Sequence, residues 1–211
     1  MPKAFENLGK AVFPGCGAYG IPRIHPTAVE LPSQWQSFNF AKTEKEPTGK
    51  GLHFFVDDYQ FIRCWNQPER YLAMISRFAA VCSPDFSTYT DMPMAMQIYN
   101  HYRKHWLGAY WQSCGMVVIP TISWSTRESF GWCFDGEPED SVVAVSSVGT
   151  QNSKERKRLF LDGYEAMLER LHPQLIIFYG QVPEECKGSH ILVGSFQEGL
   201  RMRCNPGKDV I

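Results

Sequence analysis

The stretch Ser141-Val-Val-Ala-Val-Ser-Ser147 is a short run of β-branched and small residues, and Leu175-Ile-Ile-Phe-Tyr179 is a second apolar run. Runs of this length and composition are typical of strands that are buried on both faces. Between them, Asn152-Ser-Lys-Glu155 has the pattern of a helix start, and apolar residues then recur at helical spacing up to Leu171, before Pro173. A strand, a helix and a strand in this order predict a parallel βαβ unit.

The same alternation extends toward the amino terminus as far as residue 52. Two more helices are predicted, one over residues 66–79 and a long one that follows Asp91-Met-Pro93 and stops near Gly115. The predicted strands are His53 to Asp58, Ala80 to Phe86, Met116 to Ser123, Ser141 to Ser147, Leu175 to Tyr179 and His190 to Gly194.

These elements predict an α/β fold of about six mostly parallel strands with intervening helices. Two arrangements fit, an incomplete βα-barrel-like sheet and an open doubly wound sheet. We favour the barrel-like form because the strands end in polar residues that would gather at one rim, and because no Gly-rich turn follows the first strand. The sequence predicts two regions: an irregular Pro/Gly-rich arm, residues 1–50, that packs on the main domain, and a single α/β domain, residues 51–211.

The composition excludes several classes of protein. With 211 residues, a formal net charge of -1 and 44% hydrophobic residues, the chain has the balance of a globular domain and no overall positive charge to hold a polyanion. No apolar run approaches the length of a membrane span, and no secretory signal pattern opens the sequence, so we expect a cytoplasmic protein without a membrane partner. The seven cysteines show no metal-knuckle or disulfide pattern and are expected to pack in the core.

Functional side chains are expected beyond the carboxyl ends of the parallel strands, where loops converge. Three aspartates occupy such places, namely Asp57, Asp58 and Asp85. Convergent carboxylates would suit a divalent cation such as Mg²⁺ or Mn²⁺, or general acid/base catalysis, so these three are the candidate catalytic and metal-binding residues. An aspartate after a strand also often caps the next turn, and for Asp85 the two interpretations are equally weighted. Ser123, Trp124 and Tyr179 are the candidate substrate-binding residues.

The pair His101 and His105 stands at i and i+4 on the long helix and could share a metal ion. Tyr102 and Trp106 occupy the neighbouring buried stripe, so a cationic surface formed with Arg103 and Lys104 is favoured over zinc binding. The basic residues 154 and 156–158 of the last helix are most simply a solvated face.

Several separate blocks of the sequence carry a resemblance to a known family. The blocks are Phe55-Val-Asp-Asp-Tyr-Gln-Phe61, Cys64-Trp-Asn-Gln-Pro-Glu-Arg70, Ser83-Pro-Asp-Phe-Ser-Thr-Tyr89, Asp91-Met-Pro93, Trp111-Gln112 and Val118-Ile-Pro-Thr-Ile-Ser-Trp124. Together they resemble an uncharacterised domain family, DUF4417, found mainly in bacteriophages and bacterial mobile elements. The resemblance runs from about residue 50 to residue 181. It brings no established activity, and it implies a phage or mobile-element protein in the host cytoplasm.

Three functions remain open on these grounds. The first is a metal-dependent enzyme that acts on the phosphates of nucleic acid or nucleotides, in the manner of a phosphoester hydrolase. The second is a non-catalytic protein that binds a host protein or nucleic acid through its rim and arm. The third is an electrostatic nucleic-acid binder, which needs a basic face from Arg103, Lys104, Lys154, Arg156, Lys157 and Arg158.

Overall fold

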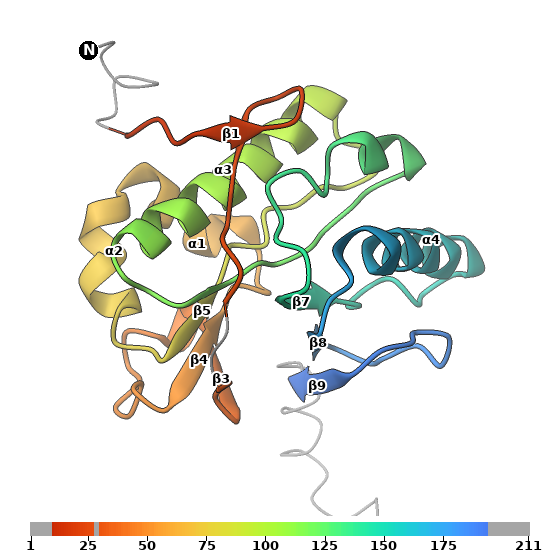
Figure 1. Cartoon of the computed structure of the whole chain (residues 1–211). Coiled ribbons are helices and arrows are strands. Elements are labelled where there is room, and N and C mark those ends of the chain that lie inside the picture. Colours follow the sequence, from red (N-terminus) through yellow and green to blue (C-terminus); the bar gives the residue numbers. More distant parts are fainter. Residues whose placement is uncertain (1–9, 28–29, 194–211) are drawn as a thin grey trace, which may run out of the picture.

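The computed structural model describes residues 10–27 and 30–193, and it has mixed α/β architecture (Figure 1). The strands are β1 (Gly15–Cys16), β2 (Ile21–Pro22), β3 (Gln34–Ser37), β4 (Lys50–His53), β5 (Ala80–Cys82), β6 (Val118–Ile119), β7 (Val142–Ser146), β8 (Leu175–Tyr179) and β9 (His190–Val193). The helices are α1 (Asp58–Asn66), α2 (Pro68–Ile75), α3 (Met94–Ser113) and α4 (Lys154–Leu171), with 3-10 turns η2 (Phe38–Phe40) and η3 (Arg127–Gly131).

The strands β3 to β9 are all parallel and follow one another in space in the order of the chain. One sheet has the order β3-β4-β5-β6, and a second has the order β7-β8-β9. A single parallel bridge between Thr121 and Ala144 joins the two sheets just beyond β6. Among the described residues no pairing closes β9 onto β3, so the fold is an incomplete α/β barrel-like arrangement, as predicted.

Successive side chains along each strand point alternately to a shared inner face and to the outer face of that strand's own sheet. In β8, Ile177 and Tyr179 point to an inner cluster that also contains Phe55, whereas Ile176 and Phe178 point outward. The outer face of β4 to β6 packs against α1, α2 and α3, and the outer face of β7 and β8 packs against α4 (Figure 1). The inner face is filled by side chains, since the rings of Phe55 and Tyr179 stack with centroids 4.8 Å apart. Any ligand must therefore bind at the rim of the sheet.

The structure corrects two of the predicted elements. The strand predicted from His53 to Asp58 ends at His53, and α1 begins at Asp58. Phe61, Cys64 and Trp65 recur at i, i+3 and i+4 and are buried. A helix that packs these apolar side chains against the sheet is therefore more stable here than a longer strand. Strand β3 lies within the segment predicted to be irregular, where it pairs with β4 in full register.

The described residues of the amino-terminal segment contact α3 and the cluster beneath it. The indole nitrogen of Trp106 donates a hydrogen bond to the carbonyl oxygen of Ala11 at 2.7 Å, and the buried Ile24 joins the cluster beneath α1 to α3. The ammonium of Lys10 lies 4.3 Å from the centroid of the Trp65 ring, which is cation–π geometry. Residues 1–9 of the predicted arm lie outside the described residues.

Six cysteines fall within the described residues, and all six are free thiols. Cys64, Cys82, Cys133 and Cys186 are buried, which agrees with the prediction of a packing role, whereas Cys204 and the predicted strand end Gly194 lie outside the described residues. In residues 10–27 and 30–193, none of the helices has the length and apolar character that crossing a bilayer requires.

Candidate functional site

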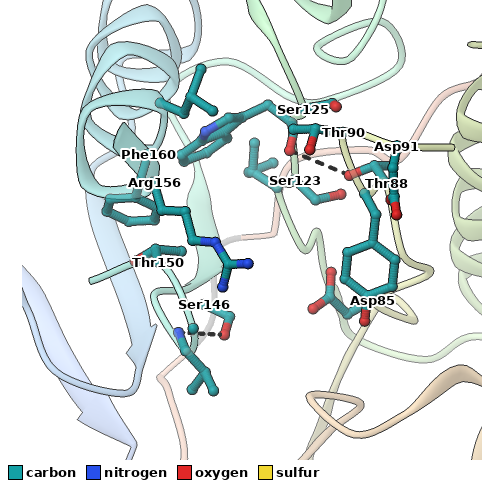
Figure 2. Close-up of a pocket in the computed structure, with 16 residues that line it drawn as sticks. Asp85, Thr88, Thr90, Asp91, Ser123, Ser125, Ser146, Thr150, Arg156 and Phe160 are labelled. Atoms are coloured by element: carbon teal, nitrogen blue, oxygen red, sulfur yellow. Dashed lines mark hydrogen bonds between the residues drawn. The ribbon is translucent and has the colours of Figure 1, made fainter. Parts of the chain in front are cut away.

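A cavity of about 660 Å³ opens at the carboxyl ends of β5, β6 and β7, next to the amino terminus of α4 (Figure 2). This is the rim at which parallel α/β folds usually carry their ligand sites. Hydroxyl groups line much of the cavity, and its walls also carry an arginine, two aspartates and an aromatic face. The lining residues are Asp85, Thr88, Tyr89, Thr90, Asp91, Ile122, Ser123, Trp124, Ser125, Ser146, Val148, Gly149, Thr150, Arg156, Leu159 and Phe160.

Asp85 lies on the β5 side of the cavity, in the loop that follows this strand. Burial raises the pKa of its carboxyl from the ordinary 3.8 to about 7; the positive charge of Lys104 opposes this shift, and the charge of Asp58 adds to it. The Asp85 carboxyl is therefore close to its pKa near neutral pH. A carboxyl in this state can both accept and donate a proton, which is the property required of a general acid or base.

Asp58 holds the loop that carries Asp85 in place. One of its carboxylate oxygens accepts a hydrogen bond from the Ser87 hydroxyl at 2.8 Å, and both oxygens accept from the Ser87 backbone N–H at 3.2 Å. Asn100 donates to the carbonyl oxygen of Ser87 at 2.6 Å, so α3 anchors the same loop. Asp58 thus has a positioning role in this structure.

Arg156 approaches the cavity from the opposite wall. Its backbone lies in the first turn of α4, where the Ser153 hydroxyl caps the helix by accepting from the Arg156 N–H at 3.2 Å. In Figure 2 the guanidinium extends away from α4 and into the cavity, toward the side that carries Ser123 and Asp85. A guanidinium and the amino terminus of a helix both favour a negatively charged ligand, so the electrostatics of this wall suit an anion.

The aromatic part of the wall is fixed by Trp124. Its indole lies over α4 at Gly163 and packs against Phe160 with ring centroids 5.4 Å apart. The Trp124 carbonyl oxygen accepts a hydrogen bond from the Thr88 hydroxyl at 3.3 Å, which connects the loops after β5 and β6 across the top of the cavity.

Gly163 is the position on α4 that lets Trp124 approach. A Cβ atom at this position would lie 2.2 Å from two atoms of the indole, so we expect Gly163→Ala to lower the free energy of unfolding by about 1–3 kcal/mol, as overpacking does. An exposed helical glycine shows the opposite sign, since alanine there stabilises by up to about 1 kcal/mol. Chemical denaturation measures the difference, and an unchanged or increased stability would show that the indole does not rest on α4.

The structure brings together three of the six predicted site residues. Asp85, Ser123 and Trp124 line the cavity. Asp57 is exposed at the start of α1, Asp58 bonds to Ser87, and Tyr179 lies outside the cavity lining, in the inner face of the sheet. Among the described residues, the three aspartates do not form a group of metal-ligand atoms.

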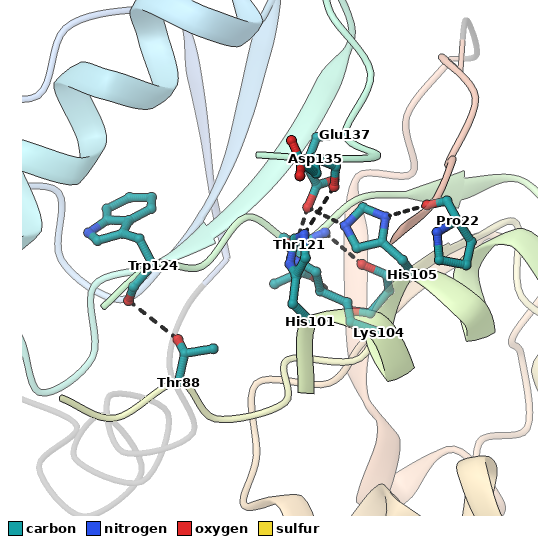
Figure 3. A network of polar contacts seen from close by, with 10 residues as sticks. Pro22, Thr88, His101, Lys104, His105, Thr121, Trp124, Asp135 and Glu137 are labelled. Atoms are coloured by element: carbon teal, nitrogen blue, oxygen red, sulfur yellow. Dashed lines mark hydrogen bonds and ion pairs between the residues drawn. The ribbon is translucent and has the colours of Figure 1, made fainter. Parts of the chain in front are cut away.

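A buried polar network lies on the inner side of α3 (Figure 3). Lys104 Nζ donates to Glu137 Oε1 at 2.8 Å and to the carbonyl oxygen of Thr121 at 2.7 Å, and His105 Nε2 lies 2.9 Å from the same carboxylate oxygen. The positive charges of His105 and Lys104 outweigh the effect of burial and lower the pKa of Glu137, so its carboxylate is ionised. Thr121 in turn donates hydrogen bonds from its N–H and its hydroxyl to Ser83, so Lys104 is connected through Thr121 to the residue that follows β5.

This network shows that the predicted cationic surface on α3 is wrong. His101, Lys104 and His105 are 2%, 1% and 0% exposed, because both sides of α3 are covered by the sheet and by the segment before β7. The guanidinium carbon of Arg103 lies 4.1 Å from the centroid of the Phe86 ring, so this side chain packs on an aromatic face. The basic face proposed for electrostatic binding of nucleic acid therefore lacks Lys104, and Lys157 is paired with Glu185 at 2.7 Å.

Sequence reasoning did not assign the cavity residues Arg156, Ser146 and Phe160. Arg156 belongs to a run of basic residues that looked like a solvated helix face. The signal that could have found it is its position in the first turn of a helix that directly follows a strand, since this turn lies at the ligand-binding rim of parallel folds.

Comparison with known proteins gives a family and a source. The chain matches the family described as "Domain of unknown function (DUF4417)" over residues 13–197. It is 41% identical over 185 residues to the "Gene 1 protein" of Mycobacterium phage D29, a match that covers 86% of this chain and 68% of the phage protein. It is 42% identical over 185 residues to the "Gene 1 protein" of Mycobacterium phage L5, covering 86% of this chain and 80% of that protein. No solved structure matches.

Proposed function

Because the chain belongs to the DUF4417 family, whose members in mycobacteriophages carry no stated activity, we propose its function from the cavity: it binds a phosphorylated ligand, a nucleotide or a nucleic-acid end. The observation that carries the proposal is the placement of Arg156 and the amino terminus of α4 across a cavity of about 660 Å³ from Asp85. We also propose that this takes place in the host cytoplasm, where phage nucleic acid and nucleotides are processed.

A phosphate group fits the α4 wall for two reasons. The amino terminus of α4, an 18-residue helix, carries partial positive charge and lies next to the cavity. The Arg156 guanidinium can form two parallel hydrogen bonds with phosphate oxygens, and the hydroxyls of Ser146 and Thr150 border the same space.

The opposite wall offers acid/base chemistry. With its pKa near 7, the ionised Asp85 can take a proton from a water molecule that attacks the phosphorus, and the protonated form can give a proton to a leaving oxygen. A Mg²⁺ or Mn²⁺ ion shared by Asp85 and the phosphate would neutralise charge in such a reaction, and this metal requirement is part of the proposal.

The test is ligand binding by the whole chain and by two matched arginine variants. Inorganic phosphate, a nucleoside monophosphate, a nucleoside triphosphate and a short single-stranded oligonucleotide are titrated by calorimetry, each with Mg²⁺ and with EDTA. We expect Arg156→Gln to weaken binding by about 10- to 100-fold, which corresponds to the loss of a charged hydrogen bond. Arg158→Gln, on the same helix but outside the cavity lining, is expected to bind like the wild type.

The outcomes separate the two functional classes. Release of phosphate that requires Asp85 and Arg156 supports an enzyme, and binding without turnover supports a recognition protein. The proposal is wrong if none of the four probes binds, or if Arg156→Gln and Arg158→Gln bind with equal affinity.

A further inference from the structure

The buried cluster of His101, His105 and Glu137 is independent of the cavity proposed above to bind phosphate. The two histidines lie one turn apart on α3, with ring centroids 4.3 Å apart, and Glu137 comes from the segment before β7. Each of the three offers one ligand atom, and these atoms all lie within 4.8 Å of one another. We propose that this cluster is a structural binding site for a zinc-class divalent ion.

The hydrogen bonds of the two imidazoles orient one nitrogen of each ring toward the cluster. A backbone carbonyl oxygen only accepts, so His105 Nδ1 donates to the carbonyl oxygen of Pro22 at 2.9 Å and His101 Nε2 donates to that of Asp135 at 3.0 Å. The second nitrogen of each ring then faces the cluster: His101 Nδ1 has no hydrogen-bond partner, and His105 Nε2 lies 2.9 Å from Glu137 Oε1. Metal-binding histidines are typically held in this way, with the far N–H bonded to a carbonyl oxygen or carboxylate.

Two atoms of the cluster lack the partner that a buried polar atom needs. His101 Nδ1 and Glu137 Oε2 are buried and have no hydrogen-bond partner, although the Glu137 side chain is 0% exposed. An unpaired buried polar atom costs about 1–3 kcal/mol, and an ion that binds both atoms would remove this cost.

The ligand set determines the class of ion. Two imidazole nitrogens and a carboxylate suit Zn²⁺ and its neighbours Co²⁺ and Ni²⁺, whereas Mg²⁺ and Ca²⁺ prefer oxygen ligands alone. Tetrahedral zinc, with bonds of about 2.0–2.1 Å, requires its ligand atoms to be about 3.4 Å apart, so the three side chains must draw together slightly on binding. With Glu137 bound through one oxygen, the three side chains supply three ligands, and a water molecule would take the fourth position.

Lys104 already bonds to one carboxylate oxygen of Glu137 and so determines which oxygen is available to the ion. Its ammonium bonds to Oε1, and a carboxylate has about four lone-pair positions, so Oε2 can bind the ion while Oε1 keeps its contact with Lys104. Without an ion, His105 Nε2 contacts Glu137 Oε1 at 2.9 Å, and a bound ion would replace this contact.

Metal binding at this place would join segments that are far apart in the sequence. It would connect α3 to the segment before β7, and through His105 to Pro22 of the arm (Figure 3). Because the cluster is buried and lies outside the cavity lining, a substrate has no access to the ion, which would stabilise the fold.

The experiment uses the full chain after mild denaturation with a chelator and refolding into metal-free buffer. Co²⁺ and Zn²⁺ are each titrated while visible absorption, stoichiometry and thermal unfolding are recorded. We expect one Co²⁺ per chain with the absorption of a tetrahedral site, displacement by Zn²⁺, and a higher melting temperature with either ion.

Two histidine variants locate the site. His101→Gln removes one ligand but keeps a hydrogen-bonding side chain, and we expect it to lower the affinity for Co²⁺ by at least about 100-fold, since even changes outside the ligand set cost 10- to 100-fold. The matched control is His25→Ala, because His25 is exposed and lies outside the cluster.

Circular dichroism tests whether the His101→Gln chain folds. If this variant does not fold, the cobalt spectrum of the wild-type chain tests the proposal by itself. The proposal is overturned if the wild-type chain shows no stoichiometric Co²⁺ absorption, or if a folded His101→Gln chain binds Co²⁺ as the wild type does. Either result leaves the cluster as a buried hydrogen-bond network of the two histidines with Glu137.

Discussion

Replacing Glu137 with glutamine lowers the free energy of unfolding by about 3–5 kcal/mol in the presence of EDTA, the expected cost of leaving one buried charge without its partner. Lys104 and Glu137 are 1% and 0% exposed, so water cannot solvate the ammonium once the carboxylate is gone. Glutamine has nearly the same shape as glutamate, so the loss reports charge and not a cavity. Urea or guanidinium unfolding at pH 7 measures it.

A double-variant cycle shows whether the loss belongs to the pair. Lys104→Met alone is expected to be destabilising by a similar amount, while Lys104→Met combined with Glu137→Leu should recover part of the stability, because apolar side chains of similar volume tolerate burial. The matched control is the exposed pair of Arg127 and Asp162, 3.0 Å apart, where removal of the charge should cost less than about 1 kcal/mol. Equal costs at the two pairs would contradict the buried geometry.

Replacing Asp85 with asparagine stabilises the chain in alkaline solution and leaves it unchanged in acid. The pKa of Asp85 is about 7 in the folded chain and near 3.8 when it is unfolded, so between these values the folded chain holds a proton that the unfolded chain releases. Wild-type stability therefore falls as the pH rises through this range, and the fall is complete above about pH 7. Asparagine does not ionise and avoids this loss.

The expected gain from Asp85→Asn is about 4 kcal/mol at pH 8 and close to zero at pH 4, since one pKa unit corresponds to about 1.4 kcal/mol. Denaturation of both chains at several pH values measures it, with the exposed Asp57→Asn as the matched control. A stability difference that does not change with pH would show that the carboxyl is not held in a dehydrating environment. A gain in stability with a loss of turnover would place Asp85 among residues kept for function at the expense of stability.

The parts of the fold that sequence could predict are those in which local pattern and tertiary role agree. Strand β8 has the predicted bounds Leu175–Tyr179, and α4 follows its capping pattern, because in each case the local preference of the chain is also what the sheet requires. Helix α1 was missed because Phe54-Phe55-Val56 looks like a strand, although the chain leaves the sheet there. Strand β3 has no apolar alternation and is specified by its neighbour β4.

The candidate site was predictable only where position along a strand was enough. Asp85, Ser123 and Trp124 follow strands, and the ends of parallel strands meet at one rim. The network of Glu137 with α3 was not predictable, because 32 residues separate Glu137 from His105. The sequence gives no sign that Lys104 is buried, since lysine is almost never buried without a partner and its partner lies in a loop.

Among the described residues, a single bridge between Thr121 and Ala144 is the strand pairing that joins the two sheets. Strands β7 and β8 pair along their full length, whereas the two sheets are linked by the hydrogen bonds that Ala144 makes with Ile122 and Pro120, each 2.8 Å long. Asp85 stands on one side of this junction and Arg156 on the other. The spacing of the two cavity walls is therefore set by how the two sheets are oriented, which the inner cluster that they share holds in place.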